Sequence, residues 1–137
     1  MNLSTETLER ENSKIRDLCA VLKVLLDNPA LRSNTVACEL LDRFNCQVKA
    51  HLLHENQTVF SKLLTGHGAQ GEKVASQFLS NTHQLKKIFA DYENHWCHDL
   101  AGSASLDAFV VETRDLIQLV MSRIDLENNK LLPLLAE

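Results

Sequence analysis

The sequence has few of the residues that interrupt regular structure, with two prolines and four glycines in 137 residues. The breaks that they make fall at Pro29, between Gly66 and Gly71, at Gly102 and at Pro133. Between these breaks apolar residues recur with helical spacing, and no segment shows the alternation typical of a strand. The sparse breaks therefore divide the chain into four long segments, each of the length of a bundle helix.

The sequence also lacks the features that mark several other classes of protein. The net charge is −4 and no block of like charge occurs, so no nucleic-acid partner is expected. No apolar run approaches the ~20 residues that a membrane-spanning helix needs, so no membrane association is expected. The segment from Met1 to Arg10 is polar and does not resemble a signal peptide, which favours a cytoplasmic protein.

Cysteine is present, but not in the spacing of a metal-binding or redox motif. None of the four cysteines forms a C-x-x-C pair. In the reducing compartment expected for this chain, disulfides are rare and free thiols behave as small apolar residues. We therefore expect core positions for Cys19, Cys38, Cys46 and Cys97.

The four segments predict an all-α, up-down-up-down four-helix bundle that forms one domain over residues 1–137. Helices are expected over roughly 5–27, 34–64, 72–97 and 106–132, with short connections that make sequential helices antiparallel. The residues expected to face the core are Leu8, Ile15, Leu18, Leu22 and Leu25 in the first helix; Leu41, Phe44 and Val48 in the second; Val74, Phe78, Leu85, Ile88 or Phe89, and Tyr92 in the third; and Phe109, Leu116, Val120 and Leu131 in the fourth.

Polar residues interrupt the apolar seams of the second and fourth helices. Steps of three and four residues along the second seam reach His51 and Glu55, and along the fourth they reach Arg123 and Glu127. Residues four apart stack on one side of a helix, so each pair belongs to the face that should be buried. Burying such groups unpaired costs several kcal/mol each, so they must meet one another, water, a metal or a ligand.

The first and third helices each add one polar residue to the same interior. Asn12 lies one turn before Ile15, and Asn81 lies on the seam between Phe78 and Leu85. Every helix thus contributes to one central polar cluster, which is the candidate site: Asn12, His51, Glu55, Asn81, Arg123 and Glu127.

Two segments resemble the hemerythrin-like, HHE cation-binding family, and the resemblance extends over nearly the whole chain. The second helix contains FNCQVKAHLLHENQTVFSKLL, which is similar to the family's H-x-x-x-E segment. The fourth contains ETRDLIQLVMSRIDLENNKLLPLL, which is similar to the second such segment and shares its L-x-P ending. The resemblance implies a hemerythrin-like bundle in which four histidines and two bridging carboxylates hold two non-heme irons.

Carried over residue by residue, the family's ligand set is incomplete in this sequence. His51 falls on the histidine of the second helix, and the two carboxylates fall on Glu55 and Glu127. The other three histidine positions hold Asn12, Asn81 and Arg123. A metal, if the protein retains one, would be held by His51, Glu55, Glu127 and water.

Arg123 favours a metal-free protein. A guanidinium is permanently charged and cannot ligate a metal. Between Glu55 and Glu127 it could replace the cation electrostatically and hold the bundle in register. We therefore predict no cofactor, a degenerate diiron site, and a non-enzymatic regulatory or binding protein with an unidentified protein partner.

Two alternatives stay open at this point. The first is a non-heme iron protein of the same fold that senses or carries oxygen or nitric oxide. The second is a transcription regulator that acts by protein–protein binding, because SRIDLENNKLL and NTHQLKKIF resemble segments of bacterial anti-sigma regulators of the Rsd/AlgQ type. An enzyme is not expected, since no Ser-His-Asp or Cys-His arrangement can be inferred.

Other histidines and glycines are assigned structural or solvent-exposed positions. His83 points nearly opposite to the apolar stripe of its helix and is expected to face solvent. His54 lies one position off its seam, which indicates a supporting or surface role. The stretch GHGAQG at 66–71 matches G-x-G-x-x-G but follows a helix, so we predict an inter-helix loop. The histidines and cysteine within 95–98 are interpreted as a solvated helix end rather than a metal site.

Overall fold

The computed structural model describes residues 3–28, 35–96 and 106–136, and every regular element in these ranges is helical. The elements are α1 (Leu3–Asp27), α2 (Thr35–His54), η1 (Glu55–Val59), α3 (Phe60–Gly66), α4 (Gly68–Trp96), α5 (Leu106–Leu126), η2 (Glu127–Leu131) and α6 (Leu132–Ala136), where η denotes a π-helical turn. They join end to end into four rods: α1, α2–η1–α3, α4 and α5–η2–α6. The predicted all-α four-helix bundle is confirmed.

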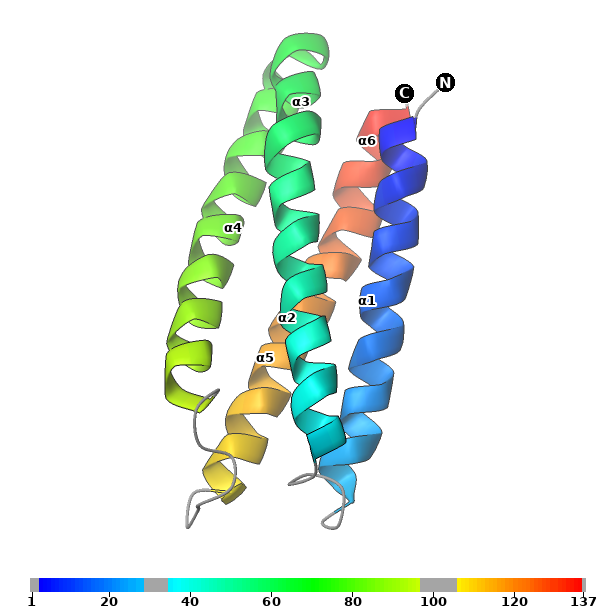
Figure 1. Ribbon diagram of the computed structural model, residues 1–137. Helices are drawn as coiled ribbons and strands as arrows, with labels where there is room; N and C mark the ends of the chain where they lie inside the picture. The colour runs from blue at the N-terminus through cyan, green and yellow to red at the C-terminus, as the bar shows by residue number, and fades with distance from the viewer. Residues whose placement is uncertain (1–2, 29–34, 97–105, 137) are drawn as a thin grey trace.

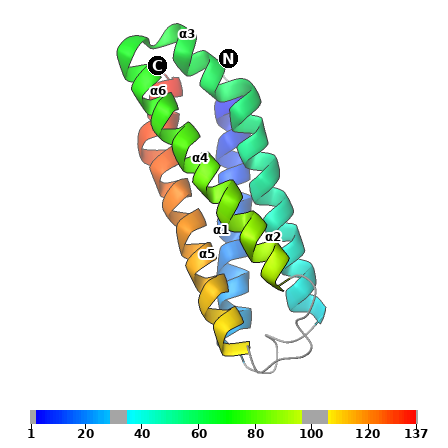
Figure 2. The same cartoon turned by 90° about the vertical axis from the view of Figure 1, so that its left-hand side faces the viewer.

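The four rods run alternately up and down the bundle. Figures 1 and 2 show each rod returning antiparallel to the one before it. The first rod contacts the second and the fourth, and α4 contacts both α3 and α5. The N- and C-terminal ends of the described chain lie at the same end of the bundle, as an even number of antiparallel rods requires.

Two clusters of buried apolar side chains fill the bundle. One cluster includes Ile15, and in it the rings of Phe44 and Phe89 pack with centroids 6.1 Å apart. The other cluster, which includes Leu8 and Phe78, lies nearer the end of the bundle that carries the termini. Between the two clusters each rod has a short stretch of polar residues. These stretches form a polar layer that separates the two apolar parts of the core.

The predicted core seams agree with the structure except at Leu18. Leu18 is only partly buried, and Cys19 is fully buried in its place. Steps of four and three residues from Ile15 pass through position 19, so the seam there follows the helical period more closely than predicted. Of the alternatives in the third helix, Phe89 is buried and Ile88 is exposed.

The prediction that the cysteines fill the core is right for Cys19 and wrong for Cys46. Both are free thiols, and Cys46 is exposed. It lies midway between the buried Phe44 and Val48, and a step of two residues on a helix points to the opposite side. Cys38 and Cys97 fall outside the residues whose side chains the structure describes.

The loop predicted at residues 66–71 is wrong, because most of that segment is helical. His67 is the single residue between α3 and α4, and α4 already begins at Gly68, whose φ of 61° permits the sharp turn. Gly71 lies inside α4 where it meets α3. A Cβ there would lie 2.2 Å from the carbonyl oxygen of Leu63, so only glycine permits this close approach.

The π-helical turns occur at matching places in the second and fourth rods. The Phe60 N–H donates to the Glu55 carbonyl, and the Leu132 N–H donates to the Glu127 carbonyl. Pro133 lies inside α6 rather than beyond the helix end as predicted, directly after the π-helical turn η2. η1 contains no proline, so what the two turns share is the buried glutamate that begins each.

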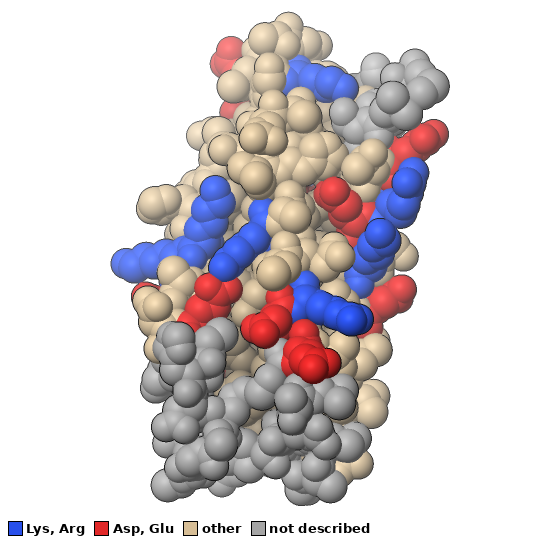
Figure 3. All heavy atoms as spheres, viewed as in Figure 1, with Lys and Arg blue, Asp and Glu red and all other residues tan. Residues whose placement is uncertain are grey.

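The surface of the described helices carries mixed charge. On the face shown in Figure 3, basic and acidic side chains lie among one another rather than in patches of one sign. Exposed ion pairs such as Arg16–Asp125 and Lys49–Glu93 join neighbouring rods, and such pairs contribute little to stability individually. Among the helices in the described ranges, none combines the length and apolar character needed to cross a membrane.

Candidate functional site

A layer of polar side chains crosses the bundle between the two apolar clusters. The structure places all six residues of the predicted cluster at this level: Asn12 on α1, His51 on α2, Glu55 on η1, Asn81 on α4, Arg123 on α5 and Glu127 on η2. Five of them are buried, Glu55 and Glu127 completely so, and Asn81 is half-buried. A buried layer of this kind must satisfy its charges internally, so its contacts decide its chemistry.

His51 lies between carboxylates on both sides of its ring. Its Nδ1 is 2.7 Å from Glu11 Oε1, and its Nε2 is 2.7 Å from both Glu127 Oε1 and Glu55 Oε1. Burial alone would favour the neutral ring, but hydrogen bonds to Glu11 and Glu127 and the nearby Glu55 carboxyl group raise the pKa of His51 to about 12. These contacts favour the protonated ring, in which both N–H groups face carboxylates.

The guanidinium of Arg123 contacts the opposite oxygens of the same two buried carboxylates. Its Nε donates to Glu127 Oε2 at 2.7 Å, and its Nη2 donates to Glu55 Oε2 at 3.0 Å. Arg123 and Glu127 are four residues apart on one rod, whereas Glu55 comes from another rod, so the guanidinium joins the second rod to the fourth.

The remaining donors of Arg123 are directed at α4. Nη1 donates to Asn81 Oδ1 at 2.7 Å and to the Phe78 carbonyl at 3.2 Å, and Nη2 donates to Thr82 Oγ1 at 2.9 Å. The guanidinium carbon also lies 4.7 Å from the centre of the Phe78 ring. A guanidinium has five N–H groups in a planar fork, and together with the two carboxylates these acceptors satisfy all of them.

The two buried carboxylates differ in their protonation. Burial raises the pKa of Glu127, but hydrogen bonds from His51 and Glu55 and the charges of His51 and Arg123 outweigh it and lower that pKa to about 2. For Glu55, burial and the neighbouring Glu127 charge raise the pKa to about 7, against the opposing effect of His51. Of this pair, Glu55 is therefore the carboxyl that holds a proton more readily.

Glu55 Oε1 explains part of this difference. It lies 2.7 Å from His51 Nε2, yet it receives no hydrogen bond among the described residues. The ring nitrogen carries one hydrogen, and that hydrogen is directed at Glu127 Oε1. A buried carboxylate oxygen without a donor disfavours ionisation, which agrees with the direction of the shift.

The residues at this level do not fit a two-iron centre. The structure groups three possible ligands, His51, Glu55 and Glu127, whose ligating atoms all lie within 4.8 Å of one another. One imidazole and two carboxylates are too few ligands for two irons. In addition, the permanently charged guanidinium of Arg123 forms ion pairs with both carboxylates. The amides of Asn12 and Asn81, at two further histidine positions of the resemblance, are poor ligands for iron.

Asn12 is at the level of the cluster but does not bond to it. Its Nδ2 donates to Asn128 Oδ1 at 3.2 Å, and its Oδ1 has no hydrogen-bond partner among the described residues. Asn12 is therefore buried at the predicted level, but among the described residues no hydrogen bond joins it to the other five. Asn12 instead faces the boundary between α1 and η2, where Asn128 lies.

Three residues that contact the site were missed from the sequence. Glu11 bonds both His51 and His54, and its hydrogen bonds to these rings overcome burial to lower its pKa. Thr82 is buried and bonds Arg123, while Asn128 bonds Asn12. A signal existed for two of them: position 11 is three residues after Leu8, and position 82 is four after Phe78, so both lie on their seams.

The histidines outside the cluster lie mostly where they were expected. His83 is exposed, as predicted. His54 is partly buried with its Nδ1 3.2 Å from Glu11 Oε1, which agrees with a supporting position beside the cluster. His67, at the turn between α3 and α4, bonds the Lys62 carbonyl at 3.3 Å. The expected solvated helix end at 95–98 lies outside the side chains that the structure describes.

Comparison with known proteins identifies a family. The family described as Hemerythrin HHE cation binding domain matches residues 3–135, which is nearly the whole chain. No curated protein and no solved structure matches it. The match therefore covers the fold and the whole polar layer, but it leaves the role of that layer in this chain to be argued from the contacts themselves.

Proposed function

The chain belongs to the hemerythrin HHE cation-binding family, and we propose that it is a metal-free, non-enzymatic member in which Arg123 replaces the metal. One observation carries the proposal. All four side-chain oxygens of Glu55 and Glu127 lie within 3.0 Å of a nitrogen of His51 or Arg123. The positive charge that two bridging carboxylates need is thus already supplied by side chains of the protein.

Buried cations already face the buried carboxylates of this arrangement without an ion. His51 and Arg123 are the two buried cations, and Glu55 and Glu127 are the two buried carboxylates. A divalent metal bound among them would have to displace the His51 proton and lie beside a guanidinium. The carboxylates on both sides of the ring raise the pKa of His51, and a metal binds only the deprotonated ring, so these contacts oppose metal binding.

The same contacts support a non-enzymatic role. A general acid or base needs an atom within hydrogen-bond reach of a substrate. His51 is 2% exposed and both its ring nitrogens contact carboxylates, while Glu127 is fully buried. These groups therefore serve to hold the rods in register, and we assign the polar layer a structural role in a protein that acts by binding.

An exposed apolar strip supports a protein partner. On α1, Val21 and Val24 are 46% and 66% exposed, and Val21 lines a groove of about 580 Å³ between α1 and α2 together with Leu18, Cys46 and Ala50. Exposed apolar strips of this kind often mark interaction sites. A transcription regulator of the anti-sigma type stays a prediction, and capture of a sigma factor by the immobilised protein would support it.

A second candidate function has one observation in its favour. Glu55 Oε1 lacks a hydrogen-bond donor and lies beside His51 Nε2 and Glu127 Oε1, which are the other ligating atoms of the possible metal group. A single cation could satisfy this oxygen if His51 lost its proton. That protein would be a mononuclear non-heme iron protein, and it would sense or carry oxygen or nitric oxide.

Thermal unfolding with and without ferrous iron distinguishes the metal-free protein from the iron-binding one. A ligand that binds the folded state at 100 times its Kd stabilises it by about 2.7 kcal/mol, which is a measurable rise in Tm. We expect no rise when anaerobic ferrous iron is added to the chelator-treated wild-type protein. Arg123→His is the matched variant, because it removes the guanidinium and adds a ligand, and its Tm should rise with iron. A clear iron-dependent rise in the wild-type Tm would reject the metal-free proposal.

A further inference from the structure

A groove of about 290 Å³ lies between α4 and α5, which Figure 2 shows side by side on the face toward the viewer. Its floor is formed by two buried side chains, Tyr92 from α4 and Leu116 from α5. The Tyr92 hydroxyl lies 2.7 Å from Thr113 Oγ1, which donates to the Phe109 carbonyl. The polar end of the ring is thus engaged inside the bundle, so the ring and Leu116 give the groove an apolar floor.

Large apolar side chains are exposed on both sides of this floor. Ile88 on α4 is 37% exposed and Leu119 on α5 is 41% exposed, and both line the groove. Val111, which is 58% exposed, lies one turn before Asp115 and extends the apolar surface along α5. Exposed apolar side chains that gather in one place often mark an interaction site, and these are directly accessible to a partner.

The charged residues that line the groove are all acidic. They are Asp91, Glu112 and Asp115, and the described lining includes no lysine or arginine. Asp91 and Asp115 are exposed, and neither forms an ion pair with another residue that the structure describes. Potentials of opposite sign favour association, so the groove favours a partner that brings positive charge to its rim and disfavours an acidic one.

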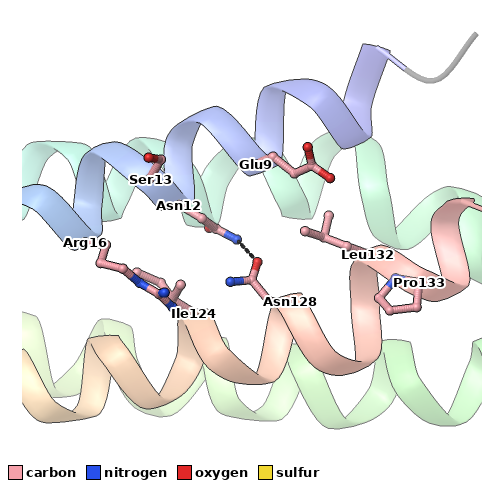
Figure 4. A pocket seen from close by; sticks show the side chains of 8 residues that line it. All are labelled: Glu9, Asn12, Ser13, Arg16, Ile124, Asn128, Leu132 and Pro133. Carbon is pink, nitrogen blue, oxygen red and sulfur yellow. Dashed lines mark hydrogen bonds between the residues drawn. The ribbon is translucent and has the colours of Figure 1, made fainter.

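Three other grooves on the described helices differ in charge. The groove between α1 and the fourth rod, drawn in Figure 4, has Glu9 and Arg16 at opposite ends. The groove between α1 and α2 combines Asp17 with Arg43, so its lining also carries both signs. The groove between α4 and the fourth rod is lined by two lysines and no carboxylate. Of these four grooves, the one between α4 and α5 is the one that joins exposed large apolar side chains to charge of a single, negative sign.

We propose that the groove between α4 and α5 binds an amphipathic helix of a partner protein, in which lysine or arginine residues flank an apolar stripe. The stripe packs on Ile88, Leu119 and the apolar floor, and the basic side chains pair with Asp91 and Asp115. A helix that binds in such a groove presents apolar residues three, four and seven positions apart, as the bundle's own rods do.

The proposal gives a partner chemistry to the binding role proposed above, but it does not depend on the absence of a metal. Ile88 lies about two turns along α4 from Asn81, so the groove is separate from the polar layer. Iron in the wild-type protein would reject the metal-free proposal and leave this one standing. Failure of the groove to bind a basic helix would do the reverse.

Titration with synthetic peptides tests the proposal. The probe is a leucine–lysine peptide of about 18 residues, which as a helix spans about 27 Å and carries leucine along one face. One comparison peptide has the same composition in an order without an apolar stripe, and another has glutamate in place of lysine. The sequence contains four isoleucines, of which Ile88 is exposed and the other three are buried, so the Ile88 methyl NMR signal reports on the groove. We expect the leucine–lysine peptide to shift this signal saturably, and both comparison peptides to shift it far less.

Variants at exposed positions locate the binding site without disturbing the core. Asp91→Asn and Asp115→Asn together should weaken binding of the leucine–lysine peptide by roughly threefold or more, as expected for two exposed ion pairs. Asp42→Asn makes the same change on an exposed part of α2 and should bind as wild type does. Leu119→Ala should weaken binding by roughly threefold, because it removes apolar surface, whereas Leu64→Ala on α3, 50% exposed, should not.

Four outcomes would overturn the proposal. Two are equal binding of the leucine–lysine peptide and either comparison peptide, and equal effects of the paired aspartate changes and Asp42→Asn. A third is an Ile88 signal that the leucine–lysine peptide does not shift at millimolar concentration. The last is an Ile88 signal that shifts with protein concentration alone, because a second copy of the chain would then cover the groove.

Discussion

Replacement of Arg123 by alanine is the change to which the bundle should be most sensitive. The substitution removes all five donors of the guanidinium and leaves Oε2 of both Glu55 and Glu127 without a partner. Both carboxylates are fully buried, so neither is in contact with bulk solvent that could replace the lost donors. Breaking a buried ion pair from one side costs about 3–5 kcal/mol, and we expect a loss of unfolding free energy in that range.

Equilibrium unfolding in urea at neutral pH measures the effect. Because a small domain has a total stability of about 5–15 kcal/mol, such a loss moves the midpoint to much lower urea. Arg114→Ala is the matched control on the same helix. Its ion pair with Asp27 is exposed, with side chains 48% and 66% accessible, so its loss should cost less than about 1 kcal/mol.

A partial rescue distinguishes electrostatics from lost packing. In the Arg123→Ala background, Glu55→Gln removes one of the two uncompensated carboxylates and should restore part of the lost stability. If Arg123→Ala alone does not fold, Arg123→Lys retains the charge without the planar fork and should show an intermediate loss. A midpoint for Arg123→Ala indistinguishable from that of the Arg114→Ala control would refute the reasoning.

Three other predictions test separate parts of the structure. The pKa of His51 is raised from 6.5 to about 12, so the stability that the protonated ring contributes is complete below pH 6.5 and is lost as the pH rises toward 12. The free energy of unfolding should therefore decline above pH 7, by at most about 1.4 kcal/mol per pH unit. This decline should be absent in His51→Gln. Gly71→Ala should lower stability by about 1–3 kcal/mol because its Cβ meets the Leu63 carbonyl, whereas Gly66→Ala, with nothing within 4 Å, should have little effect in the same thermal melts. The triple change Asn12→His, Asn81→His and Arg123→His restores the four-histidine set of the family resemblance, and elemental analysis should find iron in that variant; a folded but iron-free variant would show that the resemblance misplaces these positions.

Acid should also destabilise the cluster, because it protonates Glu127. The pKa of Glu127 is lowered to about 2, so the stability that it contributes is present above its ordinary pKa of 4.5 and is lost as pH falls toward 2. Glu55 has the opposite shift, to about 7, and its contribution is lost as pH rises from 4.5 to 7. The cluster is therefore most stabilising in mildly acidic solution, between the windows in which Glu127 and His51 lose their charges.

The number of helices and the level of the polar cluster were predictable from the sequence because both depend on helical periodicity. His51 and Glu55, like Arg123 and Glu127, lie at the points where an apolar seam becomes polar, and a polar pair on a buried face has few physical explanations. Arg123 was correctly placed against both carboxylates for the same reason.

The contacts at the edges of the cluster were less accessible to sequence reasoning. Glu11 and Thr82 lie one position from Asn12 and Asn81, and periodicity cannot decide which of two neighbours turns inward. The structure shows that Thr82 is the more buried of its pair, and that Asn12 bonds toward Asn128 rather than into the cluster. Such choices depend on the rotation of each rod, which tertiary packing sets.

The helix ends were also misjudged for local reasons. Glycines near position 70 predict a loop, but Gly71 is required by the close packing of α4 on α3 and lies inside the helix. Pro133 predicts a helix end, but the π-helical turn before it continues into α6. In both cases a residue that usually breaks a helix lies inside a continuous helical rod.

Metal content is the measurement that tests the central claim most directly. The protein should be purified without chelator, analysed for iron and other transition metals, and examined by near-ultraviolet and visible absorption. The account predicts a colourless, stably folded protein with far less than one metal ion per chain, because His51 and Arg123 already neutralise Glu55 and Glu127. Near-stoichiometric iron with oxo-bridge absorption would contradict it, and would show that iron displaces the guanidinium of Arg123 from the two carboxylates.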